Sequence, residues 1–380
     1  MTIVFTGGGT GGHFYPLIAI AEAMRDTVRE KRLIDPKLYF LAPAPFDEKS
    51  LFEHGILFVK IPAGKHRRYA SFENVTGMFT SFFGVLTALI TLFRIYPDVV
   101  VSKGGYGSVP TTVAARFLRI PVIIHESDAK PGRANLYASK WARHIAISFP
   151  SAAHYFPTDV QNKIARTGIP IRKSLTQIEP EGARQYLGLE PGVPTIVVLG
   201  GSLGSVRINE NIVSALPDLV SFATVIHQTG RDHLAQVQNL ASEVLRGNPH
   251  ANRYKPFDYL NELSMQRVAG VADVVISRAG SGAINEIAIW KKPAILIPIP
   301  EEVSHDQRTN AYTFAETGAA IVIEEANLTP HILASEAKRI ATSPELAKSM
   351  GERAGDFADP DAARILAEEA LSIGLSHEVS

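Results

Sequence analysis

The chain has 380 residues, 46% of them hydrophobic and 20% charged, which is typical of a globular protein with room for two domains of ordinary size. Lysine plus arginine equals aspartate plus glutamate, 38 of each, so the overall charge gives no reason to expect a nucleic acid partner. The absence of cysteine excludes disulfides, thiolate zinc sites and cysteine nucleophiles, and it is consistent with a reducing compartment. The first residues lack the pattern of a secretory signal, so we expect none.

The first stretch of the chain predicts a strand, a glycine loop and a helix. Residues 3–5 are apolar, residues 6–12 are almost wholly glycine, and a helical pattern begins at Phe14. Glycine lets the backbone approach a ligand, and the N–H groups at the start of a helix attract negative charge. His13 lies where the loop becomes helix, so it is a candidate proton acceptor or hydrogen-bond donor to a phosphate.

Short apolar runs alternate with helical patterns through the first half of the chain, which favours a parallel α/β sheet. Ligands gather at the carboxyl ends of such strands. We therefore expect three polar strand ends, residues 6–13, 102–108 and 125–128, to converge on one edge. His125 and Glu126 could form an interior pair, but their position beside the other two strand ends favours a site. The strands expected after the first are residues 38–41, 58–61, 99–102, 122–125 and 145–148.

One segment raises the question of a membrane. Twenty uncharged residues separate Glu73 from Arg94. They allow a buried core helix beside a solvated loop, or a peripheral membrane patch next to the basic cluster at residues 65–68. A helix that spans the membrane is the least favoured reading. The apolar side chains that recur at helical spacing are Val75, Met78, Phe79, Phe82, Phe83, Leu86, Leu89, Ile90 and Phe93.

The second half repeats the strand, glycine turn and helix, which indicates two Rossmann-like halves. Residues 277–286 predict another helix N-terminus made of small residues and suited to a phosphate, with Glu286 placed to accept hydrogen bonds from a ribose. The amides of Gln307 and Asn310 are suited to sugar hydroxyls. No spacing in this region is specific enough to predict a metal site. The strands expected here are residues 195–199, 224–227, 253–256, 274–276, 294–297 and 320–322.

Several motifs, in order from residue 1 to about 325, together closely resemble the MurG family. Its members are the peptidoglycan N-acetylglucosaminyltransferases that convert lipid I to lipid II. The motifs are Gly-Gly-Thr-Gly-Gly-His at 8–13 with Pro16, Lys-Gly-Gly-Tyr-Gly-Ser at 103–108, His-Glu at 125–126, Thr-Gly-x-Pro-x-Arg at 167–172, Gly-Gly-Ser-x-Gly at 200–204, Ser-Arg-Ala-Gly at 277–280 with Glu286, and Gln307 with Asn310.

The resemblance implies a GT-B fold, in which two Rossmann-like parallel-sheet domains face each other across a cleft. Residues 1–170 would bind the acceptor and associate with the membrane, residues 171–355 would bind the UDP-sugar, and a helix in residues 356–380 would return to the first domain. The implied reaction moves N-acetylglucosamine, with inversion, from UDP-N-acetylglucosamine to the muramoyl 4-hydroxyl of the undecaprenyl-diphosphate-linked muramoyl-pentapeptide. No cofactor would be tightly bound. The enzyme would be peripheral, on an anionic surface at the cytoplasmic face of the bacterial cell membrane.

The resemblance also assigns site residues. His13, His125 and Glu126 would be catalytic, and among the candidate bases, which include Asp128, we favour His13 because its loop borders both substrates. Tyr106 and Asn135 would bind the acceptor. No metal is expected, because a helix N-terminus and an arginine would stabilise the charge of the leaving UDP. The donor-binding residues would be Thr10, Gly11, Gly12, Asp128, Arg172, Ser202, Phe257, Asp258, Ser281, Gly282, Ala283, Ile284, Asn285, Glu286 and Gln307.

Two positions depart from the family pattern, and three alternatives stay open. Asp128 stands where the family usually has asparagine, and Leu203 where it commonly has glutamine. A GT-B transferase with another lipid or aglycone acceptor would share the donor motifs, and a non-catalytic UDP-sugar-binding protein would bind without turnover. A dehydrogenase is compatible with the G-x-G-x-x-G at residues 7–12, but no acidic residue follows the second expected strand. The oligomeric state is not predicted.

Overall fold

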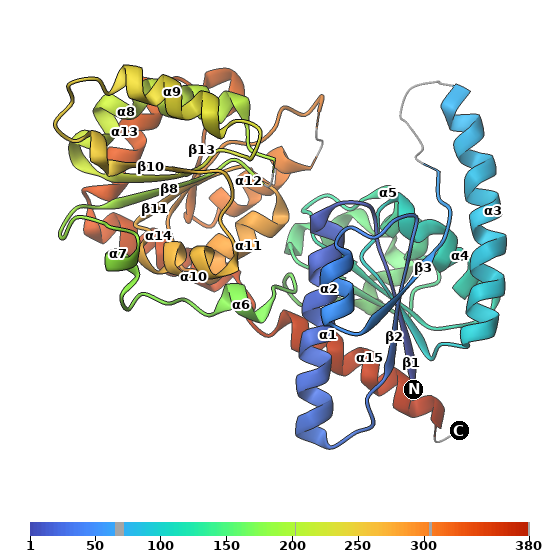
Figure 1. Ribbon diagram of the computed structural model, residues 1–380. Coiled ribbons are helices and arrows are strands. Elements are labelled where there is room, and N and C mark those ends of the chain that lie inside the picture. Colours follow the sequence, from blue (N-terminus) through green and yellow to red (C-terminus); the bar gives the residue numbers. More distant parts are fainter. Residues whose placement is uncertain (65–71, 202, 304–305, 379–380) are drawn as a thin grey trace. The chain divides into compact units, whose positions relative to one another are not determined.

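The computed structural model describes residues 1–64, 72–201, 203–303 and 306–378, and the chain in it forms two compact units (Figure 1). The first unit comprises Met1–Arg172 and Asp359–Ser380, and the second comprises Lys173–Ala358. Each unit is built on its own parallel sheet. The Rossmann-like architecture expected from the alternating pattern is therefore confirmed in both halves, while the roles assigned to the domains stay predictions.

The described part of the first unit contains a seven-stranded parallel sheet in the order β3-β2-β1-β4-β5-β6-β7. The order reverses between β1 and β4, so the loops that follow these two strands lie at the switch point where such sheets bind ligands. The sequence predicted every strand except β7, which is short and half-exposed and therefore carries no apolar run. The strands are β1 (Thr2–Thr6), β2 (Lys37–Ala42), β3 (Ile56–Lys60), β4 (Val99–Ser102), β5 (Val122–Glu126), β6 (His144–Ile147) and β7 (Ile164–Arg166).

Helices cover both faces of this sheet. Ile3 and Phe5 face a core shared with α1 and α15, whereas Val4, between them, faces a core shared with α3, α4 and α5. Both faces of the sheet are thus buried, which explains its continuous apolar strands. The helices are α1 (Gly11–Lys31), α2 (Glu48–Glu53), α3 (Phe72–Ile95), α4 (Val109–Phe117), α5 (Arg133–Ala138) and α15 (Ala362–Glu378), with 3-10 turns η1 (Tyr106–Ser108), η2 (Pro150–Tyr155) and η3 (Thr158–Lys163).

Helix α15, near the end of the chain, packs beside α1 near its start (Figure 1). Leu366 and Leu371 are buried in the core that α1 shares with the sheet. Ion pairs from Glu368 to Lys31 at 3.1 Å and from Arg364 to Glu30 at 3.3 Å flank this contact. These pairs are exposed and contribute little, so apolar burial holds the helix in place.

Helix α3 buries its small side chains and exposes its large ones. Gly84 lies directly against the carbonyl group of Pro62, and a methyl group added to it would lie 3.1 Å from Pro110 of α4. Ala88 and Leu92 continue this buried face. The reading of the large apolar stripe as core is therefore wrong, because the close approach leaves room only for small residues. The stripe is exposed over Met78, Phe79, Phe82, Phe83, Leu86, Ile90 and Phe93, while the side chain of Val75 lies outside the described residues.

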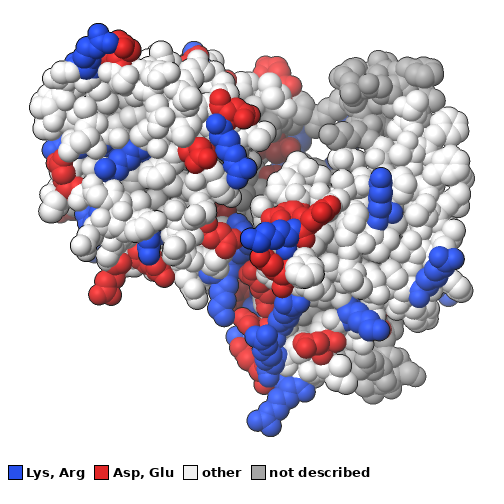
Figure 2. Space-filling view, in the orientation of Figure 1, with Lys and Arg blue, Asp and Glu red and all other residues white. Residues whose placement is uncertain are grey.

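The surface over α3 is largely uncharged (Figure 2). Residues Thr76–Ile95 have a mean hydropathy of 1.8, and only 17% of the most apolar window is buried. Among the described residues, this is the one helix long and apolar enough to cross a membrane. The basic cluster expected beside it, residues 65–68, lies outside the described residues.

The described part of the second unit contains a six-stranded parallel sheet in the order β10-β9-β8-β11-β12-β13, with its switch point between β8 and β11. The strands are β8 (Thr195–Leu199), β9 (Thr224–Gln228), β10 (Tyr254–Phe257), β11 (Val274–Ser277), β12 (Ala294–Leu296) and β13 (Ala320–Val322). The helices are α6 (Lys173–Thr176), α7 (Ala183–Tyr186), α8 (Val206–Phe222), α9 (Leu234–Val244), α10 (Glu262–Val271), α11 (Ser281–Ile289), α12 (Gln307–Ala315), α13 (Pro330–Ala341) and α14 (Pro344–Phe357), with 3-10 turns η4 (Ala251–Arg253) and η5 (Glu325–Asn327).

We expect Leu371→Ala to destabilise the first unit by about 2–4 kcal/mol, because it removes a fully packed side chain between α15 and the sheet. The chain has two tryptophans, Trp141 in the first unit and Trp290 in the second, so a Trp290→Phe background leaves fluorescence that reports on the first unit alone. Urea unfolding in this background measures the loss. Ile365→Ala, on an exposed position of the same helix, is the control and should cost less than about 1 kcal/mol. Equal losses in the two variants would contradict the packing role of α15.

Candidate functional site

The loops after β1 and β4 meet backbone to backbone at the switch point of the first unit. A Cβ added to Gly105 would lie 2.8 Å from the Cα of Gly8, and one added to Gly107 would lie 2.6 Å from the carbonyl oxygen of Gly7. Gly105 also has a φ of +77°, which favours glycine. The hydroxyl of Tyr106 would lie 3.3 Å from a Cβ on Gly9. The expected convergence of these two loops is confirmed.

Glu126, at the end of β5, organises the third loop of this edge. Its carboxylate accepts hydrogen bonds from the backbone N–H groups of Asp128 at 2.9 Å and Gly132 at 3.0 Å, and from Asn135 Nδ2 at 3.0 Å. A Cβ on Gly104 would lie 2.7 Å from this same amide nitrogen, which joins the β4 loop to the β5 loop. Burial and the neighbouring Asp128 raise the pKa of Glu126. Since both carboxylate oxygens are occupied, the geometry favours a positioning role, and the catalytic assignment stays a prediction.

His125 is fully buried and supports a turn of the backbone. Its Nε2 donates to the carbonyl oxygen of Gly168 at 2.8 Å, which requires the proton on that nitrogen. Burial, and then the charge of Lys103, hold the pKa of His125 well below its ordinary value, so the ring is neutral. Its predicted catalytic role is also untested, and its burial favours structural support.

His13 lies at the start of α1, with its Nδ1 at 2.8 Å from the hydroxyl oxygen of Thr10. Burial, and then the charge of Lys103, lower the pKa of His13 to about 4, while Asp128 acts in the opposite direction. The imidazole is therefore uncharged at neutral pH. This is the form in which a histidine can accept a proton.

Lys103 is the residue of this edge to which sequence reasoning assigned no role. Its side chain is 1% exposed, and its ammonium group donates to the hydroxyl of Ser127 at 2.7 Å. Burial lowers the pKa of Lys103, and the carboxylates of Glu126 and Asp128 oppose this effect. The sequence does contain a signal for it, since Lys103 comes directly after an apolar strand. A charged side chain at such a place either contacts a ligand or pairs with other buried charges.

Arg172, expected to contact the UDP diphosphate, ends the first segment of the first unit. Its guanidinium carbon lies 4.2 Å from the centroid of the Tyr15 ring on α1, which is a cation–π contact. The ring holds the planar cation in a fixed orientation. The contact with a diphosphate stays a prediction.

In the second unit, the loop after β11 leads into the N-terminus of α11. Arg278 of this loop donates to the hydroxyl of Ser205 at 2.6 Å and pairs with Glu325 at 2.5 Å, which fixes the loop. The helix starts after Gly280, which has no side chain to cap its N–H groups. A Cβ on Gly282 would meet nothing within 4 Å. The small first turn therefore presents accessible N–H groups, an arrangement suited to a phosphate.

Gln307 stands beside this helix N-terminus. Its Oε1 accepts from the backbone N–H groups of Ala279 and Ile299, both at 3.2 Å. This orients its amide nitrogen, which lies 4.0 Å from the position of a Cβ on Gly280. The structure thus brings Gln307 together with the α11 N-terminus, while their roles toward a donor stay predictions.

The other residues predicted to bind the donor differ in which of their polar groups are accessible. Ile284 and Asn285 are buried, and Asn285 Nδ2 donates to Ser281 O at 2.9 Å, so only their backbone groups remain candidates. The carbonyl of Phe257 accepts from Thr229 N at 2.9 Å, and that of Asp258 accepts from Gly230 N at 3.1 Å. Of the other predicted residues, Thr10 and Gly12 are exposed, Gly11, Ala283 and Glu286 are half-buried, and Ser202 lies outside the described residues.

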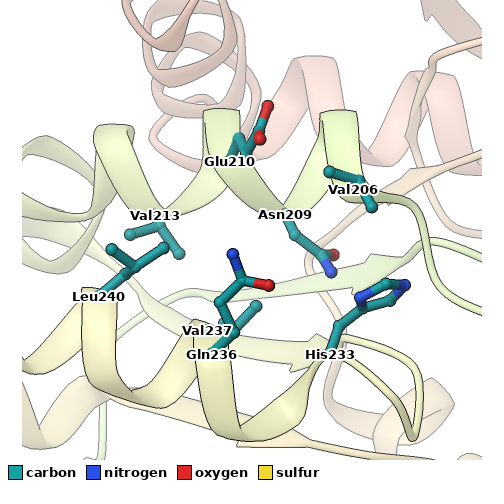
Figure 3. A pocket seen from close by; sticks show the side chains of 8 residues that line it. All are labelled: Val206, Asn209, Glu210, Val213, His233, Gln236, Val237 and Leu240. Carbon is teal, nitrogen blue, oxygen red and sulfur yellow. The ribbon is translucent and has the colours of Figure 1, made fainter.

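A small cavity lies between α8 and α9 in the same unit (Figure 3). It holds about 20 Å³, enough for one water molecule and too little for a sugar nucleotide. Asn209, which lines it, belongs to a buried hydrogen-bond chain. Tyr254 donates to His227 Nδ1 at 2.9 Å, His227 Nε2 donates to Asn209 Oδ1 at 3.1 Å, and Asn209 Nδ2 donates to Thr229 O at 3.0 Å. This series of hydrogen bonds ends on the carbonyl group of Thr229 and so stabilises the turn after β9.

Both halves of the chain match a family of glycosyltransferases. Residues 3–147 match the glycosyltransferase family 28 N-terminal domain, and residues 195–366 match the glycosyltransferase family 28 C-terminal domain. A UDP-N-acetylglucosamine--N-acetylmuramyl-(pentapeptide) pyrophosphoryl-undecaprenol N-acetylglucosamine transferase of Treponema denticola is 36% identical over 87% of this chain and 85% of its own length. The transferase of the same name in Symbiobacterium thermophilum is 34% identical over 98% of this chain and 96% of its own length. The chain belongs to this family, the MurG family, which confirms the resemblance.

Solved structures confirm the fold. A crystal structure of Acinetobacter baumannii MurG has a TM-score of 0.74 and 23% identity over 98% of this chain and 99% of that chain. A putative UDP-N-acetylglucosamine 2-epimerase from Listeria monocytogenes has a TM-score of 0.68 and 14% identity over 96% of this chain and 94% of that chain. Because both proteins share the fold, the fold alone does not select a reaction.

The buried His227 makes the stability of the second unit depend on pH. Burial lowers the pKa of His227 to about 3, so below about pH 6.5 the unfolded chain binds a proton that the folded chain does not. Stability therefore falls as the pH falls. In a Trp141→Phe background, where Trp290 reports on this unit, His227→Gln should reduce the loss between pH 6 and pH 5 by about 1 kcal/mol.

His331→Gln, at an exposed position on α13, is the matched control and should keep the wild-type dependence on pH. If His227→Gln also kept the full dependence, His227 would not be a buried neutral group. Urea unfolding at the two pH values measures both variants.

Proposed function

We propose that this chain transfers N-acetylglucosamine from UDP-N-acetylglucosamine to the muramoyl 4-hydroxyl of lipid I, with inversion, and so forms lipid II in peptidoglycan synthesis. The observation that carries this proposal is the match along nearly the whole chain to relatives that bear this activity in their names. The two switch points support it, since each combines a glycine loop with the start of a helix.

We infer that His13 is the general base of the acceptor edge. It is uncharged at neutral pH and it follows directly from the glycine loop, where an acceptor hydroxyl can approach. Tyr106 on η1 and Asn135 on α5 follow the neighbouring strands β4 and β5, and we assign them to the acceptor side. Abstraction of the hydroxyl proton by the imidazole produces the nucleophile that attacks the anomeric carbon.

The donor edge would be the start of α11. Its N–H groups would bind the diphosphate and stabilise the charge that develops on UDP as it leaves. Glu286 would bind the ribose, and Gln307, oriented by its two backbone hydrogen bonds, would donate to the N-acetylglucosamine. This mechanism needs no metal ion and no tightly bound cofactor.

We further propose that α3 holds the enzyme on the cytoplasmic face of the cell membrane as a peripheral protein. Its small face is packed on α4 and the sheet, so the helix is part of the folded unit and presents only its large side chains outward. Four exposed phenylalanines, Phe79, Phe82, Phe83 and Phe93, would enter the lipid interface. An anionic lipid surface close to the acceptor edge would supply the undecaprenyl substrate.

The purified protein should release UDP from UDP-N-acetylglucosamine only when a short-chain lipid I analogue is present, and should yield the disaccharide lipid. His13→Ala should lower kcat/KM by about 10²- to 10⁴-fold, because the proton acceptor is lost. His154→Ala, on an exposed position of the same unit, is the control and should retain activity. Donor binding without acceptor-dependent release would contradict the lipid I assignment and favour another acceptor or a non-catalytic role.

Replacing Phe79, Phe82 and Phe83 together by serine should weaken binding to vesicles of phosphatidylglycerol and phosphatidylcholine by about 10³-fold or more, since each phenylalanine buried in the lipid contributes about 1.5–3 kcal/mol. Vesicle sedimentation measures the binding. Phe52→Ser, at an exposed position on α2, should leave the binding unchanged. Wild-type protein should leave native membranes on alkaline extraction, whereas retention would indicate a spanning helix and contradict the peripheral assignment.

A further inference from the structure

The first unit buries a lysine where it faces the proposed acceptor edge. Lys103 is 1% exposed, and its ammonium group donates to Ser127 Oγ at 2.7 Å. Transferring an unpaired ammonium group from water into a protein interior is strongly unfavourable, so such a group persists only when opposite charges compensate it. The carboxylates of Glu126 and Asp128, on either side of Ser127, are the opposite charges that act on it.

Three loops surround this lysine. Lys103 itself follows β4, and its side chain donates a hydrogen bond to the loop after β5. Of the two glycines that follow it, Gly104 packs against Asn135 and Gly105 packs against Gly8. A Cβ on Gly105 would lie 3.3 Å from the Nε2 of His13. A displacement of the Lys103 backbone would therefore move both the imidazole and the Asn135–Glu126 hydrogen bond.

We propose that Lys103 is a positioning residue, whose buried ammonium group neutralises Glu126 and Asp128 and fixes the loop of residues 126–128 against His13. The proposal rests on the proposed function, in which His13 accepts the proton. Lys103 itself touches no substrate, because its side chain is enclosed by the protein.

The position of this cation also controls the charge of His13. Burial and then the charge of Lys103 disfavour the imidazolium form, Asp128 favours it, and together they hold the pKa of His13 at about 4. The other titratable groups of this edge are Glu126, whose charge Lys103 favours, the buried His125, and Tyr106 on η1. Without Lys103, Asp128 would pull a proton toward His13 and the base would be blocked at mildly acidic pH.

The test uses Lys103→Met, which keeps an unbranched side chain and removes the charge. The pKa of His13 is measured by NMR titration of its ring, assigned by comparison with His13→Ala, and the pH profile of acceptor-dependent UDP release is measured in parallel. We expect both the His13 pKa and the acidic limb of the profile to rise by about 1 pH unit or more. At neutral pH kcat should fall while the KM for UDP-N-acetylglucosamine stays the same.

Two further variants complete the test. Lys103→Met combined with Asp128→Asn removes one charge of each sign and should return the His13 pKa toward its wild-type value. Lys130 is an exposed lysine in the loop after β5, and Lys130→Met should change neither the His13 pKa nor the pH profile of UDP release. An unchanged His13 pKa in Lys103→Met would overturn the proposal, and so would unfolding of both the single and the double variant, because charge compensation should rescue the fold.

The proposed function fails in a different way. If the wild-type protein shows no release of UDP that depends on the lipid I analogue, the lipid I assignment is wrong, while the NMR titration still reports whether Lys103 affects the pKa of His13.

Discussion

The contact between Gly8 and Gly105 is the constraint on which the proposed acceptor edge depends. At the switch point of the first sheet, the loops after β1 and β4 pass so closely that a Cβ on Gly105 would clash with the backbone of Gly8, and a Cβ on Gly8 would lie only 3.2 Å from the Cα of Gly105. Gly105 also needs a left-handed backbone conformation. With these glycines in place, His13, Tyr106 and Asn135, from three separate elements, lie on one edge of the sheet.

The same edge of the sheet buries three titratable side chains in the protein interior. Lys103, His125 and Glu126 are all buried, and each has a hydrogen bond that fixes it. Of the two histidines near this edge, His125 is committed to a backbone carbonyl, and His13 is the one to which we assign the role of base. The second unit uses another device for negative charge: the uncapped N-terminus of α11, made accessible by Gly282 and bordered by an oriented Gln307. In the proposed function, the first unit would accept the proton of the acceptor hydroxyl and the second would bind the leaving diphosphate.

Helix α3 shows how packing decides the meaning of an apolar pattern. Its periodicity distinguishes two faces, one of large and one of small apolar side chains, and either could be buried. The approach of Pro62 and Pro110 selects the small face, so the aromatic side chains point outward. The burial of Ile284 and Asn285 within α11 is a similar case: a motif identified the segment, but the helix packing decided which side chains face inward.

The sequence by itself determined the class of fold, nearly all strands, the glycine loops and the family. These follow from local patterns and from residues kept in order along the chain, and alternation of strands and helices already places the strand ends on one edge. It did not reveal β7, whose three residues carry no apolar run, nor the pairing of Lys103 with the loop after β5. Only the tertiary structure decided these features and the exposed face of α3, because burial and charge pairing depend on neighbours that are distant in the sequence.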